Sequence, residues 1–486
     1  MSDKKLNILF AASEVVPFAK TGGLADVAGA LPKAIKELGH DIKVVMPRYY
    51  KIDTSKLTKL EEPLGVPMGV MGEFWAGVYT TTLPNSDVSI YFIDYEEYFG
   101  RSGLYEDEHG NGYKDNANRF MFFSKAALQL CKMLHFTPDI IHANDWHTAA
   151  MPLLSKTRFI HDFAHAKSVL TIHNLQHQGV FFKGLMDVME VGWEHFNSHE
   201  FESHDNVNLL KGGIAHADAV TTVSKKYANE IQTSEFGFGL ENHIQAHSHK
   251  VYGILNGVDY DEWNPSVDRL IAKKYDVGKM SGKKACKKDI QKHFGLEIRN
   301  DVVIIGFVGR FVEQKGIGLI ASVLNGVLDM DVQVVMLGTG EKWAERFFSD
   351  VSLHRLNFGL HVGYDEVMAH KIEAGSDMFL MPSLFEPCGL NQIYSLRYGT
   401  LPIVRATGGL DDTIVNFDEA HKRGNGFKFY DATHDALYFT ILWAVNVYYK
   451  NNKAFKAMQK RAMKEYFGWD RAAQSYVDVY KNISNR

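Results

Sequence analysis

The stretch MPSLFEPCGLNQ, residues 381–392, decides how the fold of this chain is predicted. It follows an apolar run, Asp377–Met381, that predicts a buried parallel strand, and it leads into Asn391–Tyr398, which predicts a helix. Loops at the carboxyl ends of parallel strands are where α/β sheets bind ligands. A proline and a glycine shape this loop and present Glu386 beside the N–H groups of a helix N-terminus. The stretch therefore predicts a site that combines an acceptor for a hydroxyl group with donors for an anion.

A second loop of the same kind, RATGGL at residues 405–410, follows the predicted strand Leu401–Val404. Each of these loops, taken alone, is equally well explained as an ordinary strand-to-helix turn. Two anion-friendly turns on successive units of one sheet favour a ligand site over that explanation.

The alternation of strands and helices predicts an α/β protein with two domains. A chain of 486 residues exceeds what one core usually fills. One βα series starts at Asn7 and a second at Val302, so we expect two parallel-sheet domains, residues 1–257 and 258–460.

Composition restricts the partners and the compartment. Net charge is −5 with both signs interspersed, which gives no support for a nucleic-acid or membrane partner. Three cysteines do not form a disulfide framework, and no signal peptide or membrane-spanning run is evident. We expect a cytoplasmic protein; its oligomeric state cannot be predicted from these features.

The first βα unit carries its own glycine-rich turn, KTGGLAD at residues 20–26. The spacing is not the dinucleotide-binding fingerprint. Lys20 with Gly22 and Gly23 suits a phosphate, and an ordinary turn with a surface lysine explains it equally well. The helix that follows should kink or break at Pro32.

Polar residues recur where strands of the first domain end. Asp145 follows the strand Asp139–Ala143, His173 follows Ser168–Ile172, and Asn256 follows Val251–Leu255. Any one of them is best explained as a turn or cap residue, but as a set at one sheet edge they favour a site.

We predict no metal site. The loop from Asp107 has Asn118 where a calcium loop needs Glu, and Asp329-Met-Asp331 lies before a strand, at the wrong end for a site. Histidines 195, 199, 204, 243, 247 and 249 lack an evident carboxylate partner at ligand spacing, so we expect them to be solvated. Residues 260–295 are expected to be a linker and surface stretch, and the eight lysines within 273–292 a solvated helix face.

Arg310 and Lys315 lie on one glycine-bounded loop after the strand Val302–Val308. A guanidinium fork and an ammonium group both suit a diphosphate. Departure of a nucleotide diphosphate from a sugar builds negative charge, which cations and helix N-termini can stabilise without a metal. Glu386 would then bind the sugar hydroxyls or stabilise positive charge on the ring; a surface salt-bridge set is the competing explanation.

The motifs, taken in order, resemble those of the glycogen/starch synthase family. The resemblance covers nearly the whole chain and includes a C-terminal segment, FGWDRAA at 467–473, similar to that family's closing helix. The motifs that carry it are KTGGLADV from Lys20, His173-Asn174 with Gln178-Gly179, Gly309-Arg310 with Lys315-Gly316, FEPCGL from Phe385 and TGGLDDT from Thr407.

This resemblance implies a GT-B architecture: two Rossmann-like domains with a deep cleft between them, and a C-terminal helix, residues 461–486, that returns to the first domain. It implies transfer of glucose from ADP-glucose to the non-reducing 4-hydroxyl of an α-1,4-glucan, with retention and without a cofactor or metal. The residues do not select ADP-glucose over UDP-glucose.

The family's site residues transfer to matching motif positions. Glu386, Lys315, Arg310, His173 and Asp145 are the implied catalytic set. The implied donor-binding positions are Lys20, Gly22, Gly23, Asn256, Tyr364, Cys388, Gly389, Leu390, Thr407, Gly408 and Gly409.

Two positions depart from the family pattern. Asn391 occurs where threonine is more common, and His177 where tyrosine is more common. Neither removes a charge that the reaction needs. Two other hypotheses remain open: a related GT-B transferase that uses UDP-glucose or another acceptor, and a non-catalytic glucan-binding relative.

Overall fold

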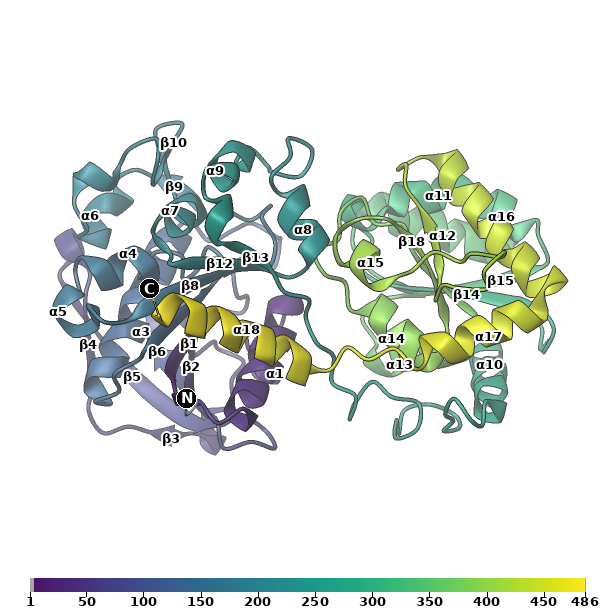
Figure 1. Cartoon of the computed structure of the whole chain (residues 1–486), viewed down its shortest axis with the longest axis horizontal. Helices are drawn as coiled ribbons and strands as arrows, with labels where there is room; N and C mark the ends of the chain where they lie inside the picture. Colours follow the sequence, from purple (N-terminus) through teal and green to yellow (C-terminus); the bar gives the residue numbers. More distant parts are fainter. Residues whose placement is uncertain (1–3, 486) are drawn as a thin grey trace. The chain divides into compact units, whose positions relative to one another are not determined.

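The structure, a computed structural model, describes residues 4–485. The chain forms two compact units (Figure 1). Unit 1 comprises the chain up to Val223, Ala228–Gly257 and the chain from Trp469 onward, and unit 2 comprises Ser224–Tyr227 and Val258–Gly468. The returning C-terminal segment thus starts at Trp469 and not at 461, because helix α17 (Asn452–Ala462) buries Phe455 and Met458 in the core of unit 2.

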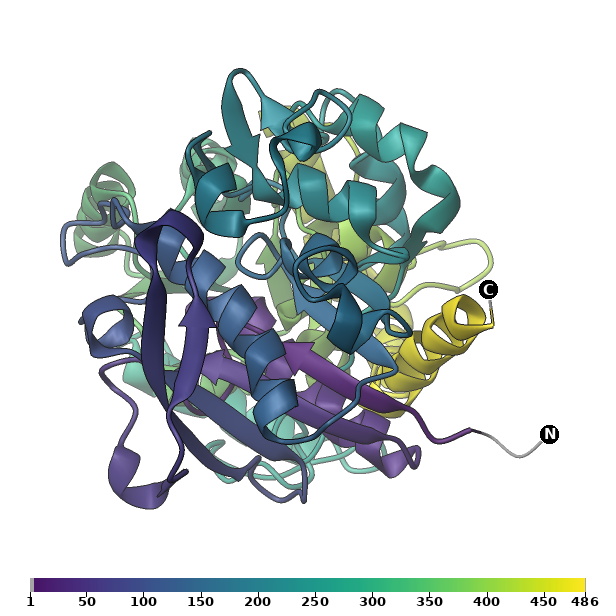
Figure 2. The same cartoon turned by 90° about the vertical axis from the view of Figure 1, so that its left-hand side faces the viewer.

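Unit 1 is built on one large twisted sheet with strand order β13-β12-β8-β7-β1-β2-β6-β5-β3, in which β4 pairs with β5 (Figure 2). The run from β13 to β6 is parallel, and β5 is antiparallel to β6. The topological switch point lies between β1 and β7, so the loops after these two strands meet at one sheet edge. The strands are β1 (Asn7–Ala11), β2 (Asp41–Pro47), β3 (Thr58–Lys59), β4 (Leu64–Pro67), β5 (Glu73–Thr82), β6 (Ser89–Asp94), β7 (Ile140–Asn144), β8 (Lys167–Ile172), β12 (Ala219–Thr222) and β13 (Val251–Gly253), with a separate small sheet of β9 (Val180–Phe182), β10 (Glu202–Ser203) and β11 (Asn206–Asn208).

The C-terminal helix is an integral part of unit 1. Helix α18 (Trp469–Ser484) packs on α1 (Gly23–Glu37), and its Tyr476 and Tyr480 are fully buried. Helix α1 runs through Pro32 without the expected break. The other helices of this unit are α2 (Glu96–Phe99), α3 (Asn116–Met133), α4 (Met151–Lys156), α5 (Ile160–Phe163), α6 (Leu185–Met189), α7 (Leu209–His216) and α9 (Glu241–Ala246); α8 (Lys225–Glu230) starts in unit 2 and ends in unit 1.

Unit 2 has a six-stranded parallel sheet in the order β16-β15-β14-β17-β18-β19. This is the doubly wound Rossmann order, and its switch point lies between β14 and β17. The strands are β14 (Val303–Val308), β15 (Val332–Gly338), β16 (Phe358–Val362), β17 (Met378–Met381), β18 (Leu401–Arg405) and β19 (Phe427–Phe429). The helices are α10 (Ser281–His293), α11 (Ile317–Leu328), α12 (Lys342–His354), α13 (Glu366–Gly375), α14 (Asn391–Tyr398), α15 (Gly408–Thr413), α16 (His434–Lys450) and α17.

The expectation that residues 260–295 are a surface stretch was wrong for α10. Lys283 and Lys287 are buried, while Lys284 and Lys288 are exposed. Lys283 Nζ donates to Thr400 Oγ1 (2.7 Å), and Lys287 pairs with Asp377 (2.7 Å) at the start of β17. The inner face of this basic helix is therefore anchored to the sheet by its own lysines.

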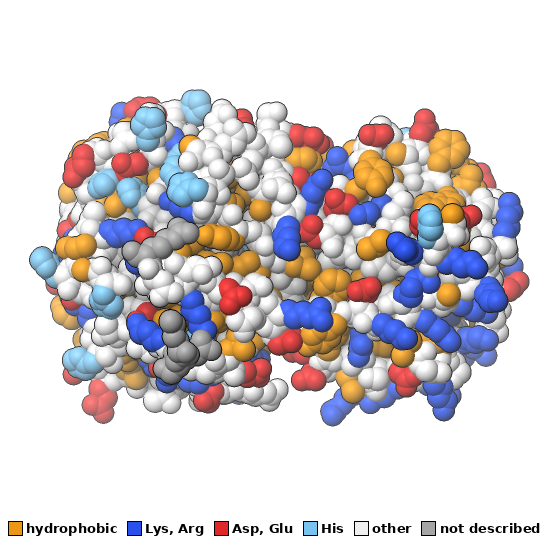
Figure 3. Space-filling view, in the orientation of Figure 1, with side chains coloured by type: hydrophobic (Ala, Val, Ile, Leu, Met, Phe, Trp, Pro, Cys, Tyr) orange, Lys and Arg blue, Asp and Glu red, His pale blue; other side chains and the backbone are white. Residues whose placement is uncertain are grey.

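The charges on the surface agree with the modest net charge. Figure 3 shows acidic and basic side chains interspersed on the face it presents, with basic side chains most frequent on unit 2. In the described part of the chain, no helix has the length and the apolar character needed to cross a membrane.

Candidate active site

The switch point of unit 2 brings together the loops after β14 and β17. Lys315 Nζ lies 2.6 Å from Glu386 Oε2, and Ser383 Oγ donates to the same oxygen (3.0 Å). The Glu386 side chain is 7% exposed and that of Lys315 is 22% exposed. A buried carboxylate needs a cation and hydrogen bonds to stay ionised, and these two neighbours supply both.

Backbone packing fixes this pair. Leu384 N donates to Gln314 O (2.9 Å), which ties the two loops directly. Gly316 has a φ of +69°, and a Cβ there would clash with Pro382 O. Only glycine therefore fits directly after Lys315. Gln314, which joins the loops, was not singled out from the sequence, because its role depends on a contact with a distant loop.

Arg310 is exposed, whereas Lys315, on the same loop, is partly buried. Its Nη2 lies 3.4 Å from Gln314 Oε1, a long contact that leaves the guanidinium able to turn toward a ligand. Tyr364, which follows β16, is 80% exposed and presents its ring to solvent. Both predicted donor contacts are accessible, although the structure does not test their roles.

The N-terminus of α14 is suited to an anion. Its N-cap, Leu390, makes no side-chain capping bond, so the first N–H groups of the helix lack the usual acceptor. Gly389 has a φ of +69°, and the Gln392 side chain donates to the carbonyls of Cys388 (3.1 Å) and Gly389 (3.0 Å). The side chain of Gln392, in the first turn of α14, therefore holds the Glu386 loop, and no N-cap side chain does so. Cys388 itself is buried beside these groups.

The Thr407-Gly408-Gly409 turn packs directly on the Glu386 loop. Gly409 N donates to Glu386 O (3.1 Å) and to Pro387 O (3.2 Å). A Cβ at Gly408 would clash with Glu386 O, and one at Gly409 with Cys388 O. The two glycines are thus explained by close packing. The prediction that this turn meets a phosphate stays a prediction, and the Gly409 N–H already has acceptors.

Asn391, one of the two departures from the family pattern, has a structural role. Its Nδ2 donates to Val308 O (2.9 Å) at the end of β14. The side chain thereby links the first turn of α14 to the strand that carries the Lys315 loop. The other departure, His177, is exposed in unit 1.

In unit 1, the loop after β1 places a buried glutamate that sequence reasoning missed. Glu14 accepts hydrogen bonds from Thr21 Oγ1 (2.6 Å), Gly22 N (3.2 Å) and Tyr105 OH (2.6 Å), and also from the Thr21 N–H. The Gly22 N–H, which was predicted to donate to a phosphate, therefore already donates to the Glu14 carboxylate. Lys20 pairs with Asp26 (2.7 Å) at the other side of the turn.

Open space in front of the turn remains consistent with a ligand. A Cβ at Gly22 or at Gly23 would meet nothing within 4 Å. No packing constraint within unit 1 therefore requires glycine at either position. The signal that could have found Glu14 is its place directly after β1, at the switch point of the sheet.

Asp145 and His173 lie together at the same edge, after β7 and β8. His173 N donates to Asp145 Oδ1 (2.7 Å), and Asp145 has a φ of +54°. Burial raises the pKa of Asp145 to about 7, although backbone N–H groups of His173 and Asn174 oppose the shift. This carboxyl group is thus close to half-protonated at neutral pH.

Hydrogen bonds fix the tautomer of His173. Its Nε2 lies 2.9 Å from Asn144 Oδ1, while Asn144 Nδ2 donates to Ala11 O (3.0 Å). The oxygen of Asn144 therefore faces the ring, so Nε2 carries the proton and Nδ1 keeps a lone pair. Burial lowers the pKa of His173 to about 3, which keeps the ring neutral. Nδ1 can accept a hydrogen bond from a ligand hydroxyl.

Asn256 and His147 each bury a polar atom without a partner. Among the described residues, Asn256 Oδ1 and His147 Nδ1 have no hydrogen-bond partner. The His147 ring stacks on Tyr105, with 4.7 Å between ring centroids, which connects it to the glutamate of the β1 loop. His147 and Tyr105 were not predicted as site residues, since only the fold brings them together.

The expectation that the histidines lack a carboxylate partner was wrong for one cluster. Glu200 Oε2 lies 2.6 Å from His195 Nδ1 and 2.6 Å from His216 Nε2. Glu200 is 5 residues from His195 and 16 from His216, so the sequence shows no ligand-like spacing for this cluster. Glu200 already serves as acceptor for both rings.

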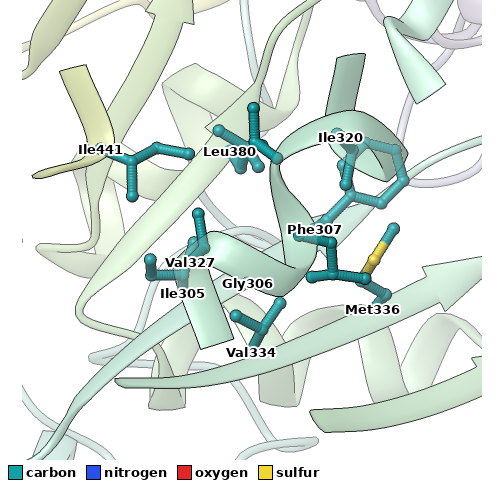
Figure 4. A pocket seen from close by; sticks show the side chains of 11 residues that line it. Ile305, Gly306, Phe307, Ile320, Val327, Val334, Met336, Leu380 and Ile441 are labelled. Atoms are coloured by element: carbon teal, nitrogen blue, oxygen red, sulfur yellow. The ribbon is translucent and has the colours of Figure 1, made fainter. Parts of the chain in front are cut away.

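A small apolar cavity in unit 2 is not part of the site. It has a volume of ≈ 10 Å³ and lies between the sheet and helices α11 and α16 (Figure 4). Its lining contains no polar side chain: Ile305, Gly306, Phe307, Ile320, Val323, Leu324, Val327, Val334, Met336, Leu380 and Ile441. It is a packing gap in the core.

Comparison with known proteins agrees with this arrangement. Residues 7–246 match the family described as starch synthase catalytic domain, and residues 288–463 match glycosyl transferases group 1. The chain is 52% identical to glycogen synthase 1 of Geobacter sulfurreducens over 481 residues, covering 98% of this chain and 96% of the relative. The chain belongs to the glycogen/starch synthase family. It is therefore a glycosyltransferase.

Other members support the same assignment. Glycogen synthase of Treponema denticola is 42% identical, with 98% of each chain covered. The solved catalytic domain of starch synthase IV from Arabidopsis thaliana, bound to ADP and acarbose, is 31% identical, with a TM-score of 0.92 and coverage of 99% of this chain and 100% of that one. The predicted fold class, two Rossmann-like domains of the GT-B type, is confirmed.

Proposed function

We propose that this protein is a glycogen synthase that transfers glucose from ADP-glucose to the non-reducing 4-hydroxyl of an α-1,4-glucan, with retention of configuration, and releases ADP. The observation that carries the proposal is the Lys315–Glu386 pair at the switch point of the unit 2 sheet, beside the N-terminus of α14. The similarity to a starch synthase bound to ADP supports the choice of nucleotide.

The cationic groups of unit 2 suit the departing diphosphate. As the glycosidic bond to phosphate breaks, negative charge builds on the leaving oxygen. Lys315, Arg310 and the N–H groups at the start of α14 would stabilise that charge; the helix N–H groups are fixed in advance, and the two side chains would turn toward it. Tyr364, exposed after β16, would stack on the base.

Glu386 suits the sugar side. Its carboxylate would accept hydrogen bonds from glucose hydroxyls and would stabilise the positive charge that develops on the ring. In the protein without substrate, Lys315 compensates this charge at 2.6 Å. Movement of the ammonium toward the diphosphate would open the Glu386 oxygens to the sugar hydroxyls.

Unit 1 supplies groups for the sugar and the acceptor. His173 Nδ1, kept as a lone pair by the Asn144 contact, would accept a hydrogen bond from a glucose hydroxyl. Asp145 would lie on the acceptor side, with a pKa of about 7 that lets it exchange a proton near neutral pH. We propose that none of these steps needs a metal and that the enzyme works in the cytoplasm, where its three cysteines would stay reduced thiols.

The test is ADP release from ADP-glucose in the presence of glycogen. We expect turnover, incorporation of glucose into glycogen, and a kcat/KM for ADP-glucose well above that for UDP-glucose. Glu386→Gln, which keeps the size of the side chain, should lower kcat by about 10²-fold or more while glycogen binding persists. Glycogen binding by the parent without turnover of either donor would instead support a non-catalytic relative, and preference for UDP-glucose would overturn the donor assignment.

A further inference from the structure

Two carboxylates and an imidazole that are not assigned to the reaction converge in unit 2. Glu366 and His370 lie four residues apart on α13, so they share one face of the helix. Glu262 comes from the segment that precedes α10. One ligand atom from each of the three residues lies within 4.8 Å of the other two.

The imidazole is held rigidly from behind. His370 Nδ1 lies 2.9 Å from Asp268 Oδ2, and Tyr398 OH donates to the same oxygen (2.5 Å). Trp263 stacks on the ring, with 3.7 Å between centroids and an interplanar angle of 16°. His370 is 1% exposed, so its ring has one orientation.

The remaining nitrogen lacks a partner. Because Nδ1 is engaged with Asp268, Nε2 is the ring nitrogen that remains for a ligand. His370 Nε2 is buried and makes no hydrogen bond to any described residue. A ring nitrogen that is buried and unpaired carries a free-energy cost unless something else binds it.

The two carboxylates add to that imbalance. The cluster thus places one imidazole nitrogen and two carboxylate groups within reach of a single ion. Such a set is neutralised by a bound cation.

We propose that Glu262, Glu366 and His370 bind a divalent cation of the zinc class. An imidazole nitrogen and carboxylate oxygens are ligand types that this ion uses, and water would complete the coordination. The Asp268–His370 contact matches the carboxylate–histidine arrangement that orients metal ligands. Both glutamates are exposed, which gives the ion a path of entry.

The expected role of the ion is structural. It would link the segment around Glu262 to the first turn of α13, just after Tyr364. The proposed transfer reaction does not require it. The prediction of no metal would therefore hold for the chemistry and fail for this part of the fold.

The test uses the full-length protein after treatment with a chelator. Equilibrium dialysis with Zn²⁺ and titration with Co²⁺, read by visible absorption, give the stoichiometry and the coordination geometry. We expect the parent to bind one equivalent of metal ion. The Glu366→Gln and Glu262→Gln variants should each bind none. The matched control is Glu200→Gln, which alters the only other cluster of this kind among the described residues and should keep that equivalent. Zinc should raise the melting temperature of the parent and not that of Glu366→Gln.

Three outcomes would overturn the proposal. The parent binds no Zn²⁺ or Co²⁺, which would mean that a proton on His370 satisfies the cluster. Glu366→Gln binds as many equivalents as the parent. Of the three glutamine variants, only Glu200→Gln loses the ion, which would place the ion between His195 and His216. Because Glu366 is exposed, the glutamine variant should fold, and its circular dichroism spectrum checks this.

Discussion

Lys315 and Glu386 form an ion pair with 2.6 Å between Nζ and Oε2, although 71 residues separate them in the chain. In the protein without substrate, the group assigned to the diphosphate and the group assigned to the sugar compensate each other. Each therefore sets the electrostatic state of the other, and a substitution of either residue changes both.

This pair predicts non-additive kinetics. Lys315→Ala and Glu386→Gln should each lower kcat by about 10²-fold or more. The double variant should lose less than the product of the two single losses, since each single change leaves its partner uncompensated. Initial rates of ADP release measure all four proteins. Lys36→Ala, which breaks an ion pair with Asp41 in unit 1, should keep parental activity. Strictly multiplicative losses would mean that the two side chains act independently.

The packing of the Thr407-Gly408-Gly409 turn predicts a sensitive glycine. Gly409→Ala introduces a Cβ that clashes with Cys388 O, so the two loops must separate. We expect a lower melting temperature and a loss of activity that exceeds the loss of stability. Gly318→Ala is the matched control, because a Cβ there meets nothing within 4 Å and the position is helical. It should be neutral or stabilise by about 0.5–1 kcal/mol. Normal activity in Gly409→Ala would show that the loop contact is dispensable.

Asn391→Thr restores the residue more common in the family and predicts a local cost in this chain. The shorter side chain has no amide to donate to Val308 O. We expect the free energy of unfolding to fall by about 1 kcal/mol, with kcat changed by less than the change at Lys315. Urea unfolding and ADP release measure the two effects. An increase in stability would mean that threonine makes a better bond at this position.

Buried His142 predicts a pH-dependent stability of unit 1. Its ring contacts Tyr480 OH and Thr171 Oγ1, each at 2.6 Å, and burial lowers its pKa to about 3. Between pH 6.5 and 3, the unfolded chain binds a proton at this residue that the folded chain does not. Stability should therefore fall with falling pH by about 1.4 kcal/mol per unit from this residue.

The comparison of two glutamine variants isolates that contribution. His142→Gln should be less stable than the parent at pH 7.5, and its disadvantage should shrink as the pH falls from 6.5 toward 4.5. His249→Gln, at an exposed position, should show no such trend. Urea unfolding at several pH values measures the differences. A constant disadvantage for His142→Gln would contradict the assignment of a neutral buried ring.

Local patterns were sufficient to predict most of the fold. The helix expected at Asn391–Tyr398 has those bounds, and the strand expected at Asp377–Met381 is β17, which starts one residue later. Apolar runs of strand length between glycine-rich turns reveal a parallel sheet because both faces are buried. The interdomain cleft stays a prediction, as do the roles of the site residues.

What could not be predicted depends on distant contacts. Lys283 and Lys287 look like surface lysines because their acceptors come from β17 and the loop after α14. The place of Glu14 after β1 could mark it as a site residue, but its partner Tyr105 is far along the chain, so the contact could not be predicted. Glu200 pairs with His216 only after the small sheet has folded. Helical and strand periodicities report which face of an element is buried, but not which polar group meets which.

The placement of α18 in unit 1 has a consequence for synthesis on the ribosome. The last turns of this helix supply Tyr480, whose hydroxyl contacts His142 in the centre of the first sheet. Residues 258–468 are synthesised before those turns. The chain of the second unit is therefore complete while the core of the first still lacks helix α18. We expect the unit that starts the chain to be the last to reach its native state. A released chain truncated before Trp469 should therefore contain a protease-resistant second unit and a protease-sensitive first one.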